Sequence, residues 1–320
     1  MRTFVAMSNA STPYVLALGG ANMDITAMAA HVLTPGESIP GRVRHAPGGV
    51  ARNVAENLAR LGHAVRLISA VGDDLLGQSL LQGTGRAGVD VSNCLVLPGH
   101  ASSSYVSLHG VDGEMALAVN DMEILHALSP ERLAPRVMMV QEAQALVLDC
   151  NLSEAALAWV FAQPRQGPVF ADAVSSIKAQ RLRPWLAQLH TLKLNRAEAQ
   201  TLCGMEVASL EQAHAAAAWF VQQGVRTLSL SLGELGLCWH SATGARGLQA
   251  AIKVKAVNAS GAGDALLAGL VHAHLAGWPL AQAMPFASAC AALTMQSESA
   301  NHAGLSVAAV RALLAAKSGA

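Results

Sequence analysis

The stretch that decides the fold runs from residue 257 to residue 270 and reads VNASGAGDALLAGL. It follows an apolar run at residues 251–257 and predicts a helix that starts at the glycines. Gly261 and Gly263 let backbone N–H groups approach an anion closely, and the start of a helix adds a partial positive charge. The stretch therefore predicts an anion-binding turn followed by a helix.

Asp264 lies at the start of that helix. A carboxylate in the first helical turn stabilises a helix by about 0.3–1 kcal/mol, which is one interpretation of this residue. The other is a base that takes the proton from a hydroxyl attacking a phosphoryl group. Spacing alone leaves both interpretations open, because a short Gly-x-Gly is a weak signal.

The rest of the chain alternates short apolar runs with Ala-rich segments of helical length. Such alternation indicates a mostly parallel sheet covered by helices on both faces, so the fold class is α/β. Ser153 is a predicted helix N-cap, and Ser209 with Gln212 is a predicted capping box. The predicted strands are residues 15–18, 65–71, 145–149, 169–173, 191–194 and 227–231.

Two segments break this alternation and predict a small β layer. Residues 102–120 suggest a hairpin with its turn at residues 110–113, and residues 26–47 are non-helical with Pro-Gly breakers. Two strands are not stable alone, so this layer must cover the substrate cleft, a partner subunit, or both. We therefore expect a flexible tail at residues 1–13, one domain at residues 14–320, and a lid with strands at about 26–47 and 102–120.

Composition excludes several classes of protein. Lys and Arg total 21, as do Asp and Glu, so the net charge is zero and no basic field favours nucleic acid. No apolar run reaches the roughly 18–20 residues of a membrane span, and the N-terminus does not resemble a secretion signal. The five cysteines lack metal-ligand spacing and indicate reduced thiols in a cytoplasmic protein.

A second group of polar residues follows the first predicted strand. Asn22 and Asp24 come after Gly19 and Gly20, and Asn53 lies in the first turn of a helix that Gly48 and Gly49 open. Such residues are commonly only caps and Asx-turns. They are equally suited to hold a vicinal diol, with two acceptor oxygens and an amide. The residues alone leave both interpretations open.

The stretch at 258–264 resembles the C-terminal signature of the PfkB carbohydrate kinases, the ribokinase-like family. The resemblance implies a three-layer α/β/α fold with a β lid, an anion hole at Gly261, Ala262 and Gly263, and Asp264 as catalytic base. Many members bind a monovalent cation such as K⁺ nearby. The family's usual run begins with Asp-Thr, whereas this chain has Asn258 and Ala259, so the carboxylate expected of a K⁺ site is missing.

The block at residues 47–62 is similar to the family's N-terminal signature, which favours the diol interpretation. Asn195 and Glu198 match the family's Asn-x-x-Glu motif, linked to Mg²⁺, although they also fit a capping box. Both can hold, because Mg²⁺ can reach Glu198 through water. By this resemblance the sugar contacts are Asn22, Asp24, Gly48, Gly49 and Asn53, and the ATP contacts are Asn195, Ser231, Gly233, Gly236 and Ser288.

Further likeness lies in residues 48–53, 69–72, 102–105, 119–122, 149–151 and 191–196, and in Asn258. These stretches resemble the bacterial subgroup of this family that phosphorylates pseudouridine. That subgroup implies ATP-dependent transfer to the 5′-hydroxyl of pseudouridine. The residues we then expect at the uracil edge are Ser103, Tyr105, Asn120, Asn151 and Asp172. An exchanged lid in a homodimer would cover the lid strands.

Three other functions remain open from the sequence. A ribose, adenosine or other nucleoside kinase would keep every motif and differ around the lid and Asn151. A non-catalytic sugar-binding regulator would lack Asp264 or the anion-hole glycines, and this chain keeps both. A dinucleotide-binding enzyme is disfavoured, because residues 19–22 lack the Gly-x-Gly-x-x-Gly spacing.

Overall fold

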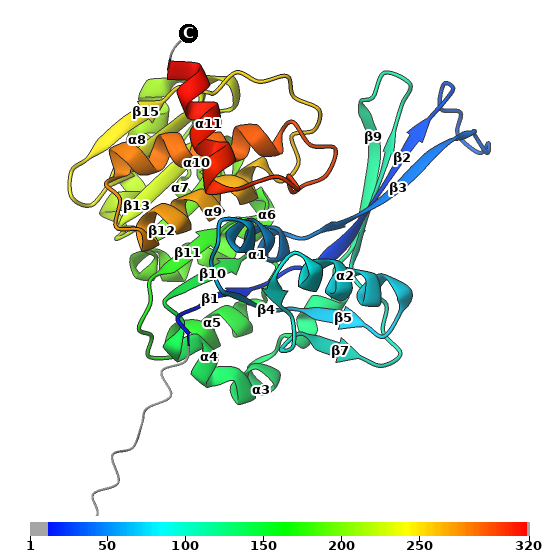
Figure 1. Ribbon diagram of the computed structural model, residues 1–320, viewed down its shortest axis with the longest axis horizontal. Coiled ribbons are helices and arrows are strands. Elements are labelled where there is room, and N and C mark those ends of the chain that lie inside the picture. Colours follow the sequence, from blue (N-terminus) through cyan, green and yellow to red (C-terminus); the bar gives the residue numbers. More distant parts are fainter. Residues whose placement is uncertain (1–11, 319–320) are drawn as a thin grey trace, which may run out of the picture.

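A computed structural model describes residues 12–318 of the chain (Figure 1). The tail predicted at residues 1–13 lies almost wholly outside the described residues. Among those described, nine strands form one central sheet. In sheet order they are β15 (Arg246–Gln249), β14 (Leu237–Ser241), β13 (Thr227–Ser231), β12 (Thr191–Asn195), β11 (Val169–Asp172), β10 (Ala145–Asp149), β1 (Val15–Leu18), β4 (Val65–Ile68) and β6 (Val89–Asp90).

The sheet is parallel from β13 to β6, and β14 and β15 add an antiparallel edge. All six predicted strands are present, three with the predicted bounds. The strand predicted at residues 65–71 is broken at the buried Ser69. Its second half, β5 (Ala70–Gly72), leaves the central sheet and pairs with β7 (Leu95–Leu97). Hydrophobicity continues through the break, so periodicity could not reveal it.

Alternate residues of each central strand face opposite layers of helix, as the pleat of a strand requires. In β1, Leu16 and Leu18 belong to one buried cluster, and Val15 and Ala17 belong to another. These two clusters are the two halves of a three-layer α/β/α core, so the predicted fold class is confirmed.

Each face has its own set of helices. The Leu16 face is covered chiefly by α3 (Pro130–Leu133), α4 (Val137–Glu142), α5 (Glu154–Ala162), α6 (Ser176–Ala179), η3 (Gln180–Gln188), α7 (Arg196–Cys203) and α8 (Leu210–Gln222). The Val15 face is covered by α1 (Val50–Arg60), α9 (Ala262–Leu275), α10 (Leu280–Thr294) and α11 (Val307–Ser318). Short 3₁₀ turns η1 (Glu123–Ala127), η2 (Ala134–Arg136) and η4 (Gly233–Leu235) connect other elements.

Two predicted helix starts are confirmed by their hydrogen bonds. The Ser153 hydroxyl accepts from the Ala156 N–H at 3.2 Å at the start of α5. At the start of α8, the Ser209 hydroxyl accepts from the Gln212 N–H, and the Gln212 side chain accepts from the Ser209 N–H. A cap of this kind is worth about 1 kcal/mol of helix stability.

A second sheet of four strands stands out from the central one as an arm (Figure 1). Its strands, in order, are β3 (Gly41–Gly48), β2 (Asn22–Ala29), β8 (Ser104–His109) and β9 (Met115–Asp121). We call this sheet the lid. At its root Met23 packs with Val71 and Leu80, the latter from α2 (Leu75–Arg86). The lid therefore has its own anchor on the main domain.

The direction in which strands are added to the sheet reverses at β1. The chain moves from β1 to β4 on one side of it and later returns to β10 on the other. In open α/β sheets, ligands bind at such a reversal, outside the carboxyl ends of the strands. The lid strands β2 and β8 begin near that same end. Within residues 12–318, no helix has the length and apolar character needed to cross a membrane.

Candidate active site

Three charged residues lie side by side at the carboxyl ends of neighbouring strands. Asp149 of β10 is in register with Asp172 of β11, which is in register with Lys193 of β12. All three are buried. The Lys193 ammonium forms an ion pair with the Asp172 carboxylate at 2.9 Å. Breaking such a buried pair by removing one partner typically costs about 3–5 kcal/mol, so this row is a fixed electrostatic feature.

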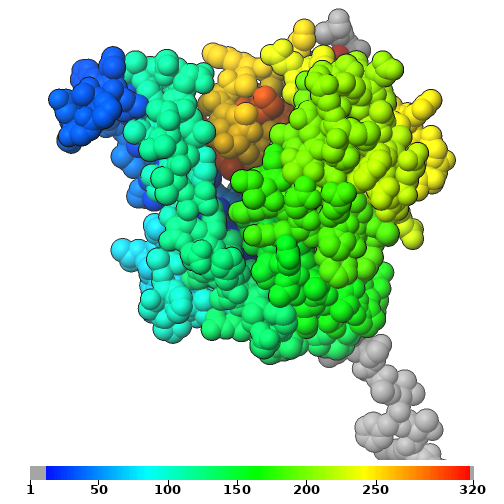
Figure 2. Space-filling view, turned by 180° about the vertical axis from the view of Figure 1, so that it is seen from behind, coloured from blue at the N-terminus to red at the C-terminus, as the bar shows by residue number. Residues whose placement is uncertain are grey.

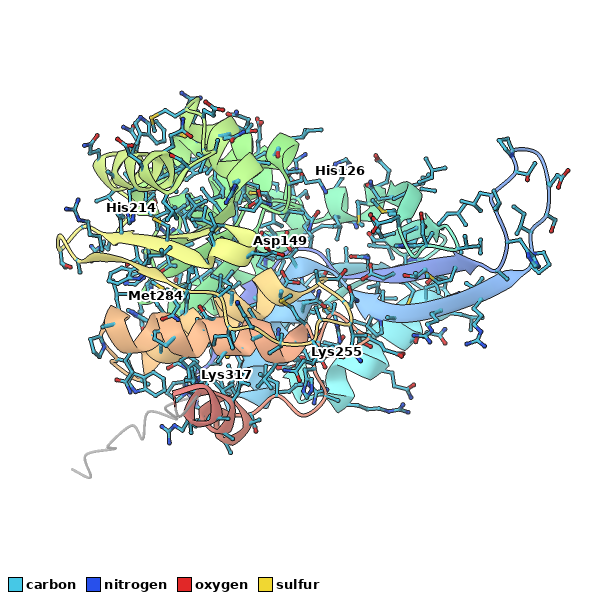
Figure 3. The ribbon with its side chains drawn as sticks, turned by 90° about the horizontal axis from the view of Figure 1, so that it is seen from above. His126, Asp149, His214, Lys255, Met284 and Lys317 are labelled. Atoms are coloured by element: carbon cyan, nitrogen blue, oxygen red, sulfur yellow. The ribbon has the colours of Figure 1, made fainter. Side chains whose placement is uncertain are left out.

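Asp149 ties the sugar-side loops to the central sheet. Its Oδ2 accepts from the Gly20 N–H and from the Ala51 N–H, each at 2.8 Å. Its Oδ1 accepts from the Asn151 N–H at 2.8 Å. Figure 3 shows Asp149 between the central sheet and the lid strands. One buried carboxylate thus holds the end of β1 and the start of α1 together.

The glycine at the start of α1 is required by both conformation and space. Gly49 has φ 97°, and a Cβ there would lie 2.5 Å from the Gly20 carbonyl oxygen. This close approach sets the first turn of α1, from which Asn53 points to the centre of the site.

Asn53 is held by hydrogen bonds to its side chain and to its backbone carbonyl. Its Oδ1 accepts from Arg52 Nη1, and its backbone carbonyl accepts from Asn301 Nδ2 at 2.9 Å. Arg52 Nη1 also donates to Asn301 Oδ1 at 2.8 Å, and Arg52 is paired with Glu56. Burial lowers the pKa of Arg52 to about 10. Arg52 and Asn301 therefore fix the orientation of Asn53.

The start of α9 is built as the sequence predicts. Gly261 is the N-cap, with φ 76°, and a Cβ there would overlap the Ala300 carbonyl oxygen. A Cβ on Gly263 would lie 2.6 Å from Lys193 Nζ, so this lysine lies against the first turn. The Ala262 N–H is engaged with the Ala259 carbonyl oxygen at 3.3 Å. The turn therefore combines helix-terminal N–H groups with an ammonium, both of which attract an anion.

Asp264 lies at the meeting point of the two sequence signatures. Its Oδ2 accepts from Asn53 Nδ2 at 2.8 Å, although the two residues are 211 positions apart. Burial, together with the nearby Asp172 carboxylate, raises the pKa of Asp264 to about 7, and Lys193 and Asn53 oppose the rise. A base is most effective when its pKa lies near the working pH. The geometry and this pKa suit Asp264 to proton abstraction.

Lys193 stays charged in this setting. Burial alone would lower its pKa, but the carboxylates of Asp172, Glu198 and Asp264 raise it above the ordinary value. Asp172 is also positioned from its other oxygen, because Oδ1 accepts from the Val174 N–H at 2.7 Å. The sequence-based interpretation placed Asp172 at the uracil edge. In the structure its carboxylate contacts Lys193 and the Val174 N–H, beside Asp149 at the same edge of the sheet.

The lid presents a row of polar side chains in register. Asp24 of β2 is opposite Tyr105 of β8, which is opposite Asn120 of β9, so all three face one side of the lid. Asn22 Nδ2 donates to Asp24 Oδ1 at 2.6 Å, and the Asp24 carboxyl lies against Gly48. Burial raises the pKa of Asp24, while the Asn22 hydrogen bond opposes the rise. Five expected substrate residues thus cluster at the lid root and along this row.

Two further expected substrate residues lie at the lid root and beside β10. Ser103 is 1% exposed, and its hydroxyl has no hydrogen-bond partner among the described residues. A buried hydroxyl without a partner costs free energy, so a ligand that bonds to it is favoured. Asn151 follows β10; its Oδ1 accepts from Lys178 Nζ at 2.7 Å, and its amide nitrogen lies close to Gly20.

The expected nucleotide residues lie further along the same edge of the sheet. Asn195 of β12 is in register with Ser231 of β13. Asn195 and Glu198 form the capping box of α7: Asn195 Oδ1 accepts from the Glu198 N–H, and Glu198 Oε2 accepts from the Asn195 N–H. The capping interpretation of this pair is therefore confirmed. Burial raises the pKa of Glu198 and Lys193 opposes the rise.

Gly233 and Gly236 form the turn between β13 and β14, with φ of 64° and 96°. The Leu232 N–H donates to the Gly236 carbonyl oxygen at 2.8 Å and closes this turn. Ser288 lies half-buried on α10, beyond the Leu266 and Met284 cluster that joins α9, α10 and β14. Among residues 12–318, no hydrogen bond or ion pair joins Ser288 to the other expected ATP residues.

A hollow separates the lid from the main domain in the space-filling view (Figure 2). Its floor shows atoms from the C-terminal third of the chain, which contains α9. A separate cavity of about 840 Å³ is lined by Arg165, His190, Arg226 and His274 among others. None of the expected site residues lines it.

Known proteins share both this fold and this sequence. A profile of the "pfkB family carbohydrate kinase" matches residues 12–306. The chain belongs to the PfkB family of carbohydrate kinases. This kinase is 43% identical to the pseudouridine kinase of Escherichia coli K12 over 301 residues, or 94% of this chain and 96% of that protein. It is an enzyme that transfers a phosphoryl group to an alcohol.

Solved structures agree with this assignment. A carbohydrate kinase from Agrobacterium tumefaciens superposes with a TM-score of 0.81 at 28% identity, covering 95% of this chain and 97% of that one. An Arabidopsis thaliana ribokinase, solved with ribose and ATP, superposes with a TM-score of 0.82 at 21% identity. It covers 95% of this chain and 99% of the ribokinase. The ribokinase-like fold is thus confirmed.

Several residues at the candidate site of this PfkB kinase were not predicted from the sequence. Asp149 ends the apolar strand β10 and Lys193 interrupts the apolar strand β12. They lie close together only because of the order of the strands in the sheet. Asn301 lies in the loop before α11 and no motif marks it. A buried charge in a predicted central strand was the available signal for Lys193, because lysine is rarely fully buried without a partner.

Asn258 has a structural role in this PfkB kinase. Its Nδ2 donates to the Glu298 carbonyl oxygen at 3.1 Å, and its Oδ1 accepts from the Ser260 N–H at 2.9 Å. The side chain thus joins the loop before α9 to the loop after α10. An aspartate at this position would lack the N–H donor for Glu298.

Proposed function

We propose that this kinase transfers the γ-phosphoryl group of ATP to the 5′-hydroxyl of pseudouridine. The observation that carries the chemistry is the Asn53–Asp264 hydrogen bond with Lys193 beside it, at the start of α9. In the reaction the 5′-oxygen bonds to the γ-phosphorus and the bond to the β,γ-bridging oxygen breaks. Asp264 receives the hydroxyl proton, and ADP leaves.

Lys193 and the first turn of α9 supply the charge that phosphoryl transfer needs. The transition state spreads negative charge over the transferred oxygens, so fixed positive groups stabilise it. Lys193 is held in place by Asp172 at 2.9 Å and stays charged over the working pH range. We assign the helix-terminal N–H groups at residues 261–264 to the same role.

The acceptor is assigned from the lid and from one relative. Asn22, Asp24, Gly48, Gly49 and Asn53 surround the lid root and are assigned to the ribose hydroxyls. Ser103, Tyr105, Asn120 and Asn151, with Asp172 at the end of β11, are assigned to the base, because they lie along the adjoining face, loop or strand end. The likeness to a protein named pseudouridine kinase at 43% identity supports pseudouridine over other nucleosides.

Mg²⁺ is assigned to the Asn195–Glu198 pair, through water. In the capping box, Oε2 of the buried Glu198 accepts a hydrogen bond. The second carboxylate oxygen of Glu198 is therefore available to a hydrated ion. When bound, the ion would neutralise phosphate charge. Asn195, Ser231, Gly233, Gly236 and, on α10, Ser288 are assigned to ATP. Because the reaction consumes ATP and all five cysteines are free thiols, we assign the enzyme to the cytoplasm.

A second copy of the chain is assigned to the outer face of the lid. In register, this face carries the two rows His45–Ile25–Val106–Val119 and Val43–Ala27–Leu108–Leu117. Val43, Leu117 and Val119 are 62–64% exposed. Two lids stacked on these faces would bury the same apolar rows in each copy, which a twofold axis allows. We therefore propose a homodimer through the lid.

The substrate is tested by measuring ADP release from the purified protein with pseudouridine, uridine, adenosine and ribose. We expect the highest kcat/KM with pseudouridine and a 5′-phosphate by mass and NMR spectra. Faster phosphorylation of ribose or adenosine would refute pseudouridine as the preferred substrate. Absence of ADP release with all four compounds would exclude pseudouridine as a substrate.

The base is tested with Asp264→Asn, with Asp90→Asn on the exposed edge of the sheet as control. General base catalysis contributes about 10²–10⁴-fold, so kcat should fall by that factor or more in Asp264→Asn. Pseudouridine binding, followed by calorimetry, should persist because the amide can still accept from Asn53. Near-normal turnover in Asp264→Asn would contradict the assignment.

A further inference from the structure

A cluster of nitrogen and sulfur ligands lies on the α8 face of the sheet, away from the active site. Cys238 and His240 are two residues apart on β14, so both side chains point to the same face. His214 meets them from α8, which packs against β13 and β14. Figure 3 shows His214 on the far side of the main domain from Asp149 and the lid.

The ligand atoms are close enough to share one ion. His214 Nδ1 lies 2.9 Å from His240 Nε2 and 3.4 Å from Cys238 Sγ, and all three atoms lie within 4.8 Å of one another. In a tetrahedral zinc site, bond lengths of 2.0–2.3 Å separate two nitrogens by about 3.4 Å and a nitrogen from a sulfur by about 3.6 Å. Shifts of a few tenths of an ångström would therefore bring His214 Nδ1 to ligand spacing from both partners, and Cys238 Sγ and His240 Nε2 are already no more than 4.8 Å apart.

The protonation states suit metal binding. A 2.9 Å contact between two ring nitrogens places one proton between them, and burial lowers the pKa of His240, with His214 and Arg246 adding to the effect. Neutral imidazoles are the form that binds metals. Burial raises the pKa of the Cys238 thiol to about 11, so an ion must displace its proton.

We propose that His214, Cys238 and His240 bind one thiophilic divalent ion, with Zn²⁺ as the expected species. Thiolate and imidazole ligands together select zinc over Mg²⁺ or Ca²⁺, which prefer oxygen. Three protein ligands leave a fourth position for water, and the half-exposed His214 gives access from solvent. The cluster is distinct from the Asn195–Glu198 pair assigned to Mg²⁺.

The ion would join α8 to the start of β14, next to the Gly233–Gly236 turn. Gly236 precedes β14, and Cys238 is the second residue of that strand. An ion that binds only the folded protein stabilises it by mass action. No sequence motif marks this cluster, because Cys-x-His with a third ligand 24 positions before Cys238 matches no common zinc spacing.

The alternative is that the three side chains only form hydrogen bonds with one another and have no affinity for metal. Metal titration of the full-length protein, after a chelator has removed bound metal, distinguishes the two possibilities. Co²⁺ titration should give one equivalent bound, with a thiolate-to-cobalt absorption in the near ultraviolet. Zn²⁺ should displace the Co²⁺ and raise the Tm. Absence of the thiolate band, or of any rise in Tm with Zn²⁺, would overturn the proposal.

Variants locate the site. His214→Gln and Cys238→Ala should each weaken Zn²⁺ binding by at least about tenfold, judged from the 10–100-fold effect of even outer-shell partners. Cys203→Ser and His63→Gln are the controls, because Cys203 and the His63–His272 pair lie outside the cluster. If buried Cys238→Ala does not fold, the half-exposed His214→Gln decides. Wild-type affinity in His214→Gln would also overturn the proposal.

Discussion

The carboxyl group of Asp264, which we propose as the catalytic base, has a cost in stability. Burial and the nearby Asp172 raise its pKa to about 7, so ionisation is less favourable in the folded protein than in the unfolded chain. The folded state therefore binds this proton more tightly. Stability is greatest below the ordinary carboxyl pKa and is lost as the pH rises toward the folded value of about 7.

Asp264→Asn should therefore stabilise the protein at about pH 8 and much less at about pH 5. The amide has a similar shape and carries no charge at either pH. Thermal unfolding of both proteins at the two pH values measures the difference in Tm. Asp90→Asn should instead lower the Tm by nearly the same amount at both pH values. The Ser92 hydroxyl lowers the pKa of Asp90, so this carboxyl is ionised in the folded and unfolded states across this pH range. A difference for Asp264→Asn that is larger at pH 5 would contradict this account.

Sequence predicted the residues of this site only where a local motif marked them. Asp264 and Asn53 each lie at a glycine-rich helix start, and the structure brings them into direct contact. Lys193 and Asp149 lie in strands and become neighbours only through the order of β10, β11 and β12. No one-dimensional pattern encodes that order.

Among the elements, helix starts were better predicted than strand ends. The capping residues at 153, 195 and 209 act within four positions, so the sequence contains both partners. The break at Ser69 depends on β5 pairing with β7, about 25 positions further along the chain, and was not predicted. The lid strand β2 likewise begins at Asn22, earlier than the predicted residue 26.

Glu198→Gln separates the two roles of the α7 capping box. Glutamine also completes capping boxes, so stability should change by less than about 1 kcal/mol. The loss of negative charge should raise the Mg²⁺ concentration needed for half-maximal kcat. Urea unfolding and Mg²⁺ titrations of turnover measure the two effects. An unchanged Mg²⁺ requirement would restrict Glu198 to capping, whereas Asn195→Ala tests the cap itself.

At the scale of the whole molecule, the lid determines the assembly that we propose. Leu117→Lys with Val119→Lys puts two charges on the exposed apolar rows and should give monomers by light scattering. Leu75→Lys is the control, because Leu75 is 81% exposed on α2, outside the lid. A monomeric wild type, or a dimer that survives both lid substitutions, would refute the lid interface.

The general architecture was predictable because each layer repeats one pattern. Alternating strands and helices implied the three-layer core, and the comparison structures agree with it. The direction of the lid and the faces of its strands were not predictable. They depend on pairing between β2 and β8, which are about 80 positions apart.

The contacts of Asp149 also have a consequence for synthesis of the chain. The loops at Gly20 and Ala51 receive their shared acceptor from a residue 129 and 98 positions later. Asn53 meets Asp264 only after another hundred or so residues. On the ribosome, the first quarter of the chain therefore emerges with its glycine-rich loops unsupported. The part of the site that we assign to the nucleoside therefore becomes ordered only when the last third of the protein has been made.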